Sequence, residues 1–428
     1  MKILPCVLAT LLLLLPSSPP LSGQVPLTRH ERNPILLAST ESDWLGALNV
    51  FGLRESPYGW RFWYCGRLPN GNFTINDAVS VDGVEIYVYA KNPVVMPQIG
   101  GARKPSVVKA GGVYWMYYYV TVGSSYAIHL STSPDGRTWQ PHPGNPVVGP
   151  GGPGAWDGAG VLAPVVLLEG NTFRMWYQGW DGSFSSIGYA TSTDGIAWTK
   201  HPGNPVLTHG GSPTDFDFLT AGEPACVRMG DWLHMYYTAV SGADRLSIGY
   251  ARSADGLVWV KSSSNPVLTP GFAAWEAVSV AASFVSTEGT RLDLYYSGLD
   301  AAGVWRTGLA RAPIVVSAGD PAGQETIPHG AQLPPLRSHP NPFNPSTVIE
   351  AAIPEGGGSV TLVIHDVAGR LVGRVSRSVA SGGVVEFTWD GTAEGGVRMG
   401  SGVYFCSVEL NGPGGRAVSP VHKLVLLR

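Results

Sequence analysis

Short runs of alternating apolar and polar residues, separated by turns rich in Gly, Pro, Asn and Ser, make up the chain from about residue 33 onward. The runs Met175-Trp176-Tyr177 and Ile187-Gly188-Tyr189-Ala190 show the pattern clearly. Alternation with a period of two predicts antiparallel strands that bury one face, and Asp-Gly steps between such runs favour hairpin turns. Beyond the N-terminal region no segment has the periodicity of an amphipathic helix. The pattern predicts an all-β protein.

A repeat organises these strands. The turn Ser-x-Asp-Gly, followed by Trp and then Asn-Pro-Val, occurs around Asp135, Asp194 and Asp255, with a degenerate copy at Asp82. Its Asp is predicted to form the turn by accepting backbone hydrogen bonds. Successive Asn-Pro steps stand 53 to 61 residues apart, somewhat more than the ~40–50 residues of a four-stranded propeller blade, so longer loops are expected. In the third unit we predict strands at 161–168, 173–179 and 186–191 and around 204–207.

The last unit and the mature N-terminus complement each other. Residues 275–312 contain three strand-like runs but end before any Asn-Pro-Val element, whereas Asn33-Pro34-Ile35-Leu36 stands alone ahead of the first unit. If the N-terminus supplies the missing outer strand, the ring closes and no sheet edge stays exposed. We therefore predict a five-bladed β-propeller. A stacked solenoid is the alternative, but it would need no complementary halves.

Composition narrows the classes of partner. Charged residues make up 14% of the chain and the formal net charge is −3, so no basic field exists to hold nucleic acid or an anionic membrane. Cys65, Cys226 and Cys406 lie far apart without a C-x-x-C spacing, which indicates neither a disulfide framework nor a zinc site. We expect them to be small buried hydrophobes.

Both ends of the chain differ from the repeats. The N-terminus combines Lys2, a short apolar run over 3–15 and small residues up to Gly23, which is the pattern of a secretory signal peptide. That run is too short to span a bilayer, so the mature protein is expected outside the cytoplasm. Residues 314–336 are rich in Pro, Gly and Ala and are typical of a linker. The strand-like runs that follow predict a small β-sandwich; they are 360–365, 384–389, 402–410 and 423–427.

The tail resembles the sorting domains carried by cargo of the bacterial type IX secretion system, which are relatives of the flagellar hook-cap immunoglobulin-like domain. The resemblance implies passage through the periplasm and then release or surface attachment; an ordinary accessory sandwich is the alternative. The predicted domains are thus a signal peptide at 1–23, a propeller at 24–313, a linker at 314–336 and an Ig-like sorting domain at 337–428. The matching segments are 341–347 (Asn-Pro-Phe-Asn-Pro-Ser-Thr), 366–372 (Asp-Val-Ala-Gly-Arg-Leu-Val), 389–391 (Trp-Asp-Gly), 401–405 (Ser-Gly-Val-Tyr-Phe) and 423–427 (Lys-Leu-Val-Leu-Leu).

The repeats, over about residues 33–312, look like the five-bladed propellers of glycoside hydrolase families 32, 43, 68 and 130. Each unit carries much of one succession: Trp with Asp or Glu, then Pro, Met-Trp-Tyr, Ile-Gly-Tyr-Ala, Ser-x-Asp-Gly and Asn-Pro-Val. The sialidase Asp-box, Ser-x-Asp-x-Gly-x-Thr-Trp, is a near neighbour, but the turn ending in Trp139 is one residue shorter. A six-bladed sialidase is therefore the less favoured alternative.

Residues that break the repeat near the starts of the innermost strands are the candidates for chemistry. Alignment of the units on their Met-x-Tyr strands places Lys104, Ala163, Glu223 and Ala282 at one shared position, with Asn49 or Val50 in the first unit. Glu223 is the one carboxylate in that column. The resemblance to families 43 and 32 implies that Glu223 is the general acid, and a channel-lining residue without chemistry is the alternative.

The second carboxylate that a glycosidase needs is less clearly marked. Asp43 is the first choice and Asp157 the second, with Asp217 behind them; a structural role is an open alternative for each. Relatives often carry Arg-Asp-Pro where this chain has Arg103-Lys104-Pro105, so a lysine replaces the expected carboxylate and weakens the hydrolase interpretation. Arg103 could still bind a sugar hydroxyl or carboxylate.

For four further side chains the sequence gives weaker evidence of a functional role. Trp156 and Trp180 could stack on sugar rings, although aromatic residues this common more often belong to the core. No metal motif is present and no cofactor is predicted. The resemblance to family 43 leaves open an axial calcium approached by His129 and His234, with buried structural histidines as the alternative.

The function predicted from sequence is a secreted or surface-attached glycoside hydrolase acting on an oligo- or polysaccharide, with Glu223 as acid and Asp43 or Asp157 as base. A non-catalytic propeller that binds glycans or proteins at the cell surface is the alternative, because fold alone does not decide activity. The expected partners are a carbohydrate and the type IX machinery, with no nucleic acid and no transmembrane segment. The chain is expected to be a monomer.

Overall fold

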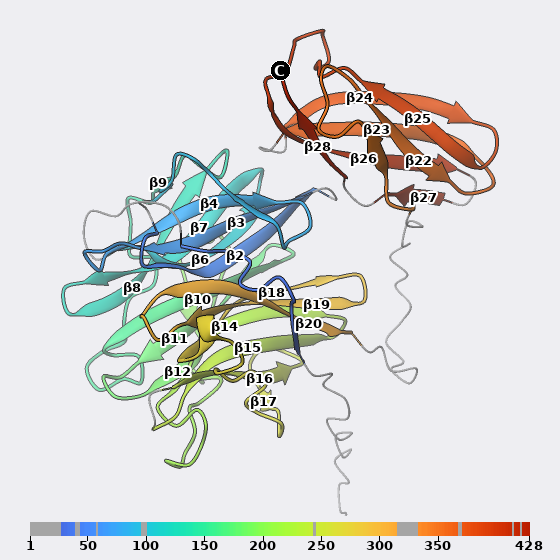
Figure 1. Ribbon diagram of the computed structural model, residues 1–428. Coiled ribbons are helices and arrows are strands. Elements are labelled where there is room, and N and C mark those ends of the chain that lie inside the picture. Colours follow the sequence, from blue (N-terminus) through green and yellow to red (C-terminus); the bar gives the residue numbers. More distant parts are fainter. Residues whose placement is uncertain are drawn as a thin grey trace, which may run out of the picture.

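The computed structural model describes two β-rich parts, shown in Figure 1 as blue-to-yellow and orange-to-red ribbons. The described residues are 27–38, 43–56, 59–95, 101–242, 245–314, 333–366, 370–412, 415–419 and 422–428. The predicted signal peptide and most of the predicted linker lie outside them. Among these residues, no helix is long and apolar enough to cross a membrane.

The first part consists of five antiparallel units, which we call blades 1 to 5. Each has three long strands that pair in sequence order, and a short outer element follows them in blades 1 to 4. The strands of blades 1 and 2 are β2 (Gly46–Ser56), β3 (Gly59–Arg67), β4 (Phe73–Ser80), β5 (Ile86–Val88), β6 (Arg103–Ala110), β7 (Val113–Val122), β8 (Ser125–Ser133) and β9 (Gln140–Pro141). Those of blades 3 to 5 are β10 (Gly160–Glu169), β11 (Thr172–Trp180), β12 (Ser185–Ser192), β13 (Thr199–Lys200), β14 (Thr220–Met229), β15 (Trp232–Val240), β16 (Leu246–Ser253), β17 (Val260–Lys261), β18 (Ser279–Glu288), β19 (Arg291–Leu299) and β20 (Trp305–Pro313).

The blades form a closed ring. The innermost strands β2, β6, β10, β14 and β18 each contact the next in cyclic order, and β18 returns to β2. The outer element of blade 5 comes from the N-terminus: β1 (Thr28–Arg29) pairs with β20, and Leu36 bridges Thr307. The predicted closure by the N-terminal segment is confirmed, as is the all-β propeller fold. A stacked solenoid would have left the first and last blades apart.

The repeated turn joins neighbouring blades. In blade 2, the Asp135 carboxylate accepts hydrogen bonds from the backbone amides of Arg137 and Thr138 at 2.9 and 2.7 Å, which confirms its turn-forming role. These bonds hold the pKa of Asp135 below its usual value, although burial opposes them. The indole of Trp63 in blade 1 donates to the carbonyl of Gly136 at 3.0 Å. Equivalent bonds from a preceding-blade aromatic residue to a turn carbonyl are made by Tyr117 to Gly195, Trp176 to Gly256 and Tyr295 to Gly83.

The Asn-Pro-Val elements close each blade's outer edge as the sequence suggests, although most of each element is not a regular strand. In blade 3 the strand pairing is divided between β13 and a single bridge from Leu207 to Ile187. The Asn204 side chain accepts from the backbone amide of Tyr189 at 2.8 Å and donates to its carbonyl at 3.0 Å. The Asn side chain therefore takes the place of a strand residue's backbone groups.

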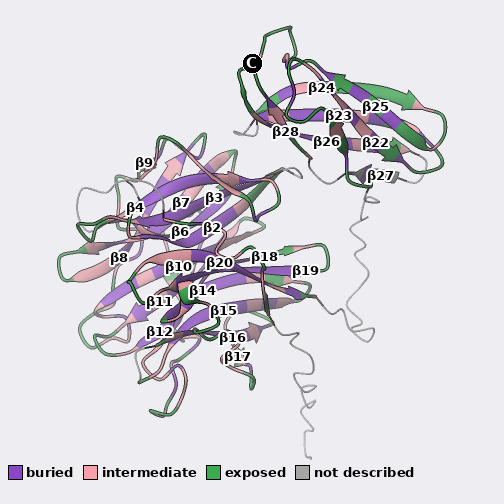
Figure 2. Cartoon of the chain, viewed as in Figure 1, coloured by how far each residue is buried: buried purple, intermediate pink, exposed green. Residues whose placement is uncertain are grey.

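Aromatic and β-branched residues fill the space between blades, so the long strands are mostly buried in Figure 2. Trp63, Tyr117, Trp176, Tyr237 and Tyr295 are among the largest fully buried side chains. The three cysteines of the described chain are buried and unpaired, which confirms the expectation for them. Burial raises the pKa of the Cys65 thiol to about 12, so it stays protonated.

The C-terminal part is a β-sandwich of two antiparallel sheets. All four strands expected from the sequence are present, and the weaker patterns of the others were missed. Leu333 and Leu336 pack in its core. The sandwich meets blade 1 where Lys423 pairs with Glu85 at 3.2 Å and Phe405 lies against Tyr87. Its strands are β21 (Arg337–His339), β22 (Thr347–Ile353), β23 (Gly358–Asp366), β24 (Leu371–Val379), β25 (Gly383–Trp389), β26 (Gly402–Gly412), β27 (Gly415–Val418) and β28 (His422–Leu426).

Candidate functional site

The shared position of the innermost strands has an unusual backbone. Asn49, Lys104, Ala163 and Glu223 have φ values between 44° and 52° and are the four non-glycine residues with positive φ in the described chain. Each lies within a bulge, where the strand pairing skips two residues. Left-handed backbone costs a non-glycine residue about 1–2 kcal/mol. The ring therefore holds one strained residue in each of four blades, at the place where the sequence alignment put them.

Side chains of the second strands support these bulges. The backbone amide of Glu223 donates to the Gln178 amide oxygen at 3.1 Å, and that of Lys104 donates to the Cys65 sulfur at 3.0 Å. Similar bonds run from Asn49 to Ser297 and from Ala282 to Thr238. In each case the acceptor belongs to the preceding blade. The sequence analysis did not predict these supporting side chains. They could have been found as one position of the second strand that carries a different residue in every blade: Cys65, Tyr119, Gln178, Thr238 and Ser297.

Glu223 and Lys104 meet across the ring. The Lys104 ammonium on blade 2 lies 3.7 Å from the Glu223 carboxylate on blade 4 and donates to the carbonyl of Ala282 on blade 5. One side chain can reach both of these blades only near the ring's axis. The hydroxyl of Thr238 donates to the same Glu223 oxygen at 2.9 Å. The geometry thus brings together two residues of the predicted site.

The two groups differ in their access to solvent. The Glu223 side chain is 24% exposed, whereas that of Lys104 is 3% exposed. Burial lowers the pKa of Lys104, and the Glu223 charge partly opposes this. Glu223 is therefore the group of the pair that a bound molecule can reach.

The other candidate carboxylates lie where each chain segment enters its blade. The tyrosine of the second strand donates to each of them: Tyr177 to Asp157 at 3.3 Å and Tyr237 to Asp217 at 3.0 Å. Lys200 and Lys261 pair with these same two aspartates, both at 2.6 Å. Asp43 accepts from Tyr64 at 2.9 Å, and Glu276 of blade 5 takes the corresponding place.

These carboxylates are all nearly inaccessible. Asp43, Asp157, Asp217 and Glu276 are at most 3% exposed. Each accepts a hydrogen bond from the second-strand tyrosine of its own blade, and Asp157, Asp217 and Glu276 each pair with a lysine or arginine other than Lys104. The signal for this network was the Tyr that recurs at one register of the second strand, which the sequence analysis did not use. The predicted catalytic roles of Asp43 and Asp157 remain predictions.

The predicted substrate-binding residues are packed against protein. The Arg103 guanidinium lies 4.2 Å from the Phe73 ring centroid and 5.7 Å from that of Tyr119. Trp156 packs on Tyr177, with ring centroids 5.8 Å apart, and Trp180 packs on Tyr126 at 6.1 Å. Trp180 and Arg103 are only partly buried, so a contact of either with a sugar stays a prediction.

The histidines lie away from the Lys104–Glu223 pair. His234 hydrogen-bonds the Tyr250 hydroxyl at 2.7 Å in blade 4, and His129 lies in β8 of blade 2. The donor set around the axis does not fit the calcium that the resemblance left open, because Lys104 places an ammonium beside the one carboxylate of the shared position. Among the described residues, no three His, Cys, Asp or Glu side chains gather as metal ligands.

The fold and site therefore define a closed β-propeller with a polar, strained ring at its axis, followed by an Ig-like sandwich. Residues 344–414 match the model of the FlgD Ig-like domain family. An uncharacterised protein of Mycobacterium tuberculosis is 26% identical over 301 residues, which cover 65% of this chain and 96% of that protein.

Solved structures of carbohydrate-active proteins share the propeller fold. The β-1,2-mannobiose phosphorylase of Listeria innocua is 16% identical with a TM-score of 0.53, covering 67% of this chain and 97% of its own. A glycosyl hydrolase from Bacteroides ovatus is 16% identical with a TM-score of 0.53, covering 68% and 94%. A structure from the GH130 family, described as mannoside phosphorylases that include hydrolases of β-1,2-mannosidic linkages in Candida mannan, is 17% identical with a TM-score of 0.55, covering 71% and 99%. At these identities the similarity establishes the fold.

Proposed function

We propose that this protein is an extracellular enzyme that cleaves glycosidic bonds, with Glu223 as the proton donor. The observation that carries the proposal is the Glu223 carboxylate: partly exposed near the propeller axis, held by Thr238 at 2.9 Å and beside the buried Lys104. A residue kept in a strained backbone conformation by its surroundings is typical of functional sites. The hydrolases and phosphorylases among the structural neighbours support a glycan as substrate.

The chemistry needs a proton for the leaving oxygen and a nucleophile at the anomeric carbon. Glu223 would protonate the glycosidic oxygen, and Lys104 could then return a proton to it. Glu223 is the one carboxylate at the shared position. The nucleophile is therefore either a water activated by Asp43 or Asp157, or an external anion such as phosphate. Assays with and without inorganic phosphate distinguish these routes, because phosphorolysis depends on it and hydrolysis does not.

Replacement of the proposed acid tests the function. We expect Glu223→Gln to lower turnover of a cleavable glycan by about 10²–10⁴-fold, because the amide keeps the Thr238 contact but cannot donate the proton. The measurement is release of reducing sugar or sugar phosphate from arabinan, xylan, fructan and β-mannosides by the purified protein. Glu288→Gln, at the last residue of β18 and beyond the bulge of that strand, is the control and should leave turnover unchanged.

A non-catalytic glycan-binding propeller is the second candidate. The observation that favours it is Lys104, whose ammonium occupies the position where a further carboxylate was expected. This candidate predicts saturable glycan binding by both the unaltered protein and Glu223→Gln, with no product from either. Turnover that survives Glu223→Gln would contradict the proposed role of Glu223 while leaving the enzyme proposal in place.

We also propose that the Ig-like domain directs export by the type IX route and that the mature protein is released or attached at the cell surface. The support is the match of this domain to the FlgD Ig-like family together with the resemblance of the tail segments to type IX sorting domains. Expression of the full chain and of a chain ending at residue 336 in a type IX-competent host tests this. Only the full chain should reach the medium or outer surface, and the shorter chain should stay in the periplasm.

A further inference from the structure

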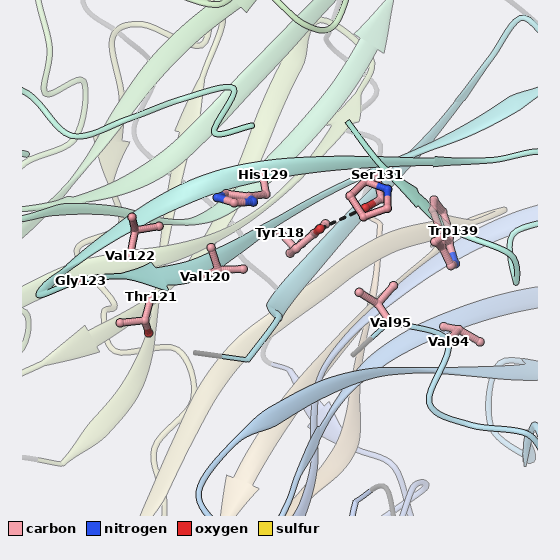
Figure 3. Close-up of a pocket in the computed structure, with 11 residues that line it drawn as sticks. Val94, Val95, Tyr118, Val120, Thr121, Val122, Gly123, His129, Ser131 and Trp139 are labelled. Atoms are coloured by element: carbon pink, nitrogen blue, oxygen red, sulfur yellow. Dashed lines mark hydrogen bonds between the residues drawn. The ribbon is translucent and has the colours of Figure 1, made fainter. Parts of the chain in front are cut away.

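A pocket of about 500 Å³ opens between blades 1 and 2, away from the Lys104–Glu223 pair. Figure 3 shows Val94 and Val95 of the segment after β5 on one side and side chains of β7 and β8 on the other. The lining is mainly apolar, with a few polar groups. This volume lies in the range of small-molecule sites.

The matching place in blade 3 is filled by the chain itself. There Trp156 covers Gly179 and Gly188, where a side chain would collide with its indole ring. The next residue, Asp157, accepts from Tyr177 and pairs with Lys200. Trp275 covers Gly298 and Gly308 of blade 5 in the same way. An aromatic ring is thus the repeat's own occupant of this position.

Blade 2 has lost most of that arrangement. The segment before β6 that corresponds to the one with Trp156 and Asp157 reads Met-Pro-Gln-Ile-Gly over 96–100, without Trp or Asp, and lies outside the described residues. Tyr118 keeps the tyrosine position, but the strand pairing puts His129 opposite it where blade 3 has Gly188. Val120 stands where Gly179 would be. Pro141 takes the place of Lys200, and Ser131 takes that of Ala190.

The polar groups of the pocket also have partners that differ from those in blade 3. The Tyr118 hydroxyl bonds Ser131 at 3.0 Å, since no carboxylate faces it as in blade 3. The His129 Nε2 atom is buried without a hydrogen-bond partner. Burial lowers the pKa of His129, so its ring is neutral near pH 7. With Lys200 replaced by Pro141, the cation that balances the carboxylate in blade 3 is missing here.

We propose that this pocket binds a small, uncharged aromatic molecule that carries one hydrogen-bonding group, with the ring against Val95, Val120 and Trp139 and the polar group toward His129. The aromatic ring of this ligand takes the place that the indole rings of Trp156 and Trp275 fill in blades 3 and 5. An anionic ligand is disfavoured because a buried charge needs a partner. The site is separate from the proposed glycan chemistry and does not depend on it.

Indole is the probe, measured by isothermal titration and saturation-transfer NMR on the full mature chain. We expect one saturable site. Val122→Trp fills the mouth of the pocket from an exposed position and should lower the affinity by at least about tenfold, whereas Val258→Trp, exposed on blade 4, should leave it unchanged. His129→Leu should weaken indole binding by about 3–10-fold, the value of one hydrogen bond, and leave benzene binding unaffected.

Three results would overturn the proposal. One is the absence of saturable indole binding by the unaltered protein. Another is indole binding that Val122→Trp does not weaken, since the ligand would then lie elsewhere. The third is indole-3-acetate binding as tightly as indole, because the pocket would then accommodate a carboxylate. Circular dichroism and thermal unfolding of each variant separate loss of binding from loss of folding.

Discussion

At the scale of single residues, burial decides how several titratable groups behave. His234 contacts Tyr250 through a 2.7 Å hydrogen bond, and burial, with a smaller contribution from the Arg252 charge, lowers its pKa to about 4. The same desolvation lowers the pKa of Lys104. At His234 the result is a neutral ring that belongs to the blade core. At Lys104 it is an amine that gives up its proton more readily than one in water.

The lowered pKa of His234 makes stability depend on pH. Between pH 6.5 and 4 the unfolded chain binds a proton at this residue and the folded chain does not, so stability falls as the pH falls through this window. Between pH 7 and pH 5 this residue should account for a loss of about 2 kcal/mol. Urea unfolding at both pH values should show that His234→Gln reduces this loss. The exposed His339, replaced by Gln, is the control and should not change it.

At the scale of elements, each blade is held by contacts that the repeat provides. The carbonyl of each repeated turn accepts a hydrogen bond from an aromatic side chain of the preceding blade. A buried carboxylate accepts a hydrogen bond from the tyrosine of the second strand. These contacts recur because every blade faces the same packing problem. Blade 2 departs from the pattern in its carboxylate network, and the pocket occurs there.

The networks of Asp157 and Asp217 should contribute alike to stability. We expect Asp157→Asn and Asp217→Asn each to lower the free energy of unfolding by about 1–3 kcal/mol, because each leaves a lysine without its buried anionic partner. Chemical denaturation measures both. An Asp157→Asn protein as stable as the unaltered one, but inactive, would contradict the structural role and support the predicted catalytic one.

At the scale of the whole molecule, the N-terminal segment closes the ring. Besides the strand pairing, Asn33 bonds both backbone groups of Leu309, and Arg29 pairs with the buried Glu276 at 2.6 Å. The C-terminal sandwich, in contrast, touches the propeller mainly around Tyr87. The two ends of the chain should therefore contribute very differently to propeller stability.

Truncation tests this difference. A chain that begins at residue 37 should unfold on the order of 10 °C below one that begins at residue 27, because it exposes an edge of blade 5 and leaves Glu276 without its cation. Differential scanning calorimetry measures both. A chain of residues 27–314 is the control and should keep the propeller transition within a few degrees. An unchanged melting temperature after loss of 27–36 would mean that this segment does not close the ring.

The sequence by itself determined the features that arise from local chemistry. Alternation predicted the strands, Ser-x-Asp-Gly predicted turns whose Asp bonds the next backbone amides, and the unmatched Asn33-Pro34 predicted how the ring closes. The position of Glu223 could also be found from the sequence, because the repeats can be aligned with one another. Only the tertiary structure decided what meets across the axis and between blades. Lys104 of blade 2 reaches Glu223 of blade 4, and Asp43 and Asp157 accept hydrogen bonds from buried tyrosines. The pocket of blade 2 lies where blades 3 and 5 carry a tryptophan ring, and the corresponding segment of blade 2, residues 96–100, has no tryptophan. Such contacts depend on how the blades are placed around the ring, which no local sequence pattern encodes.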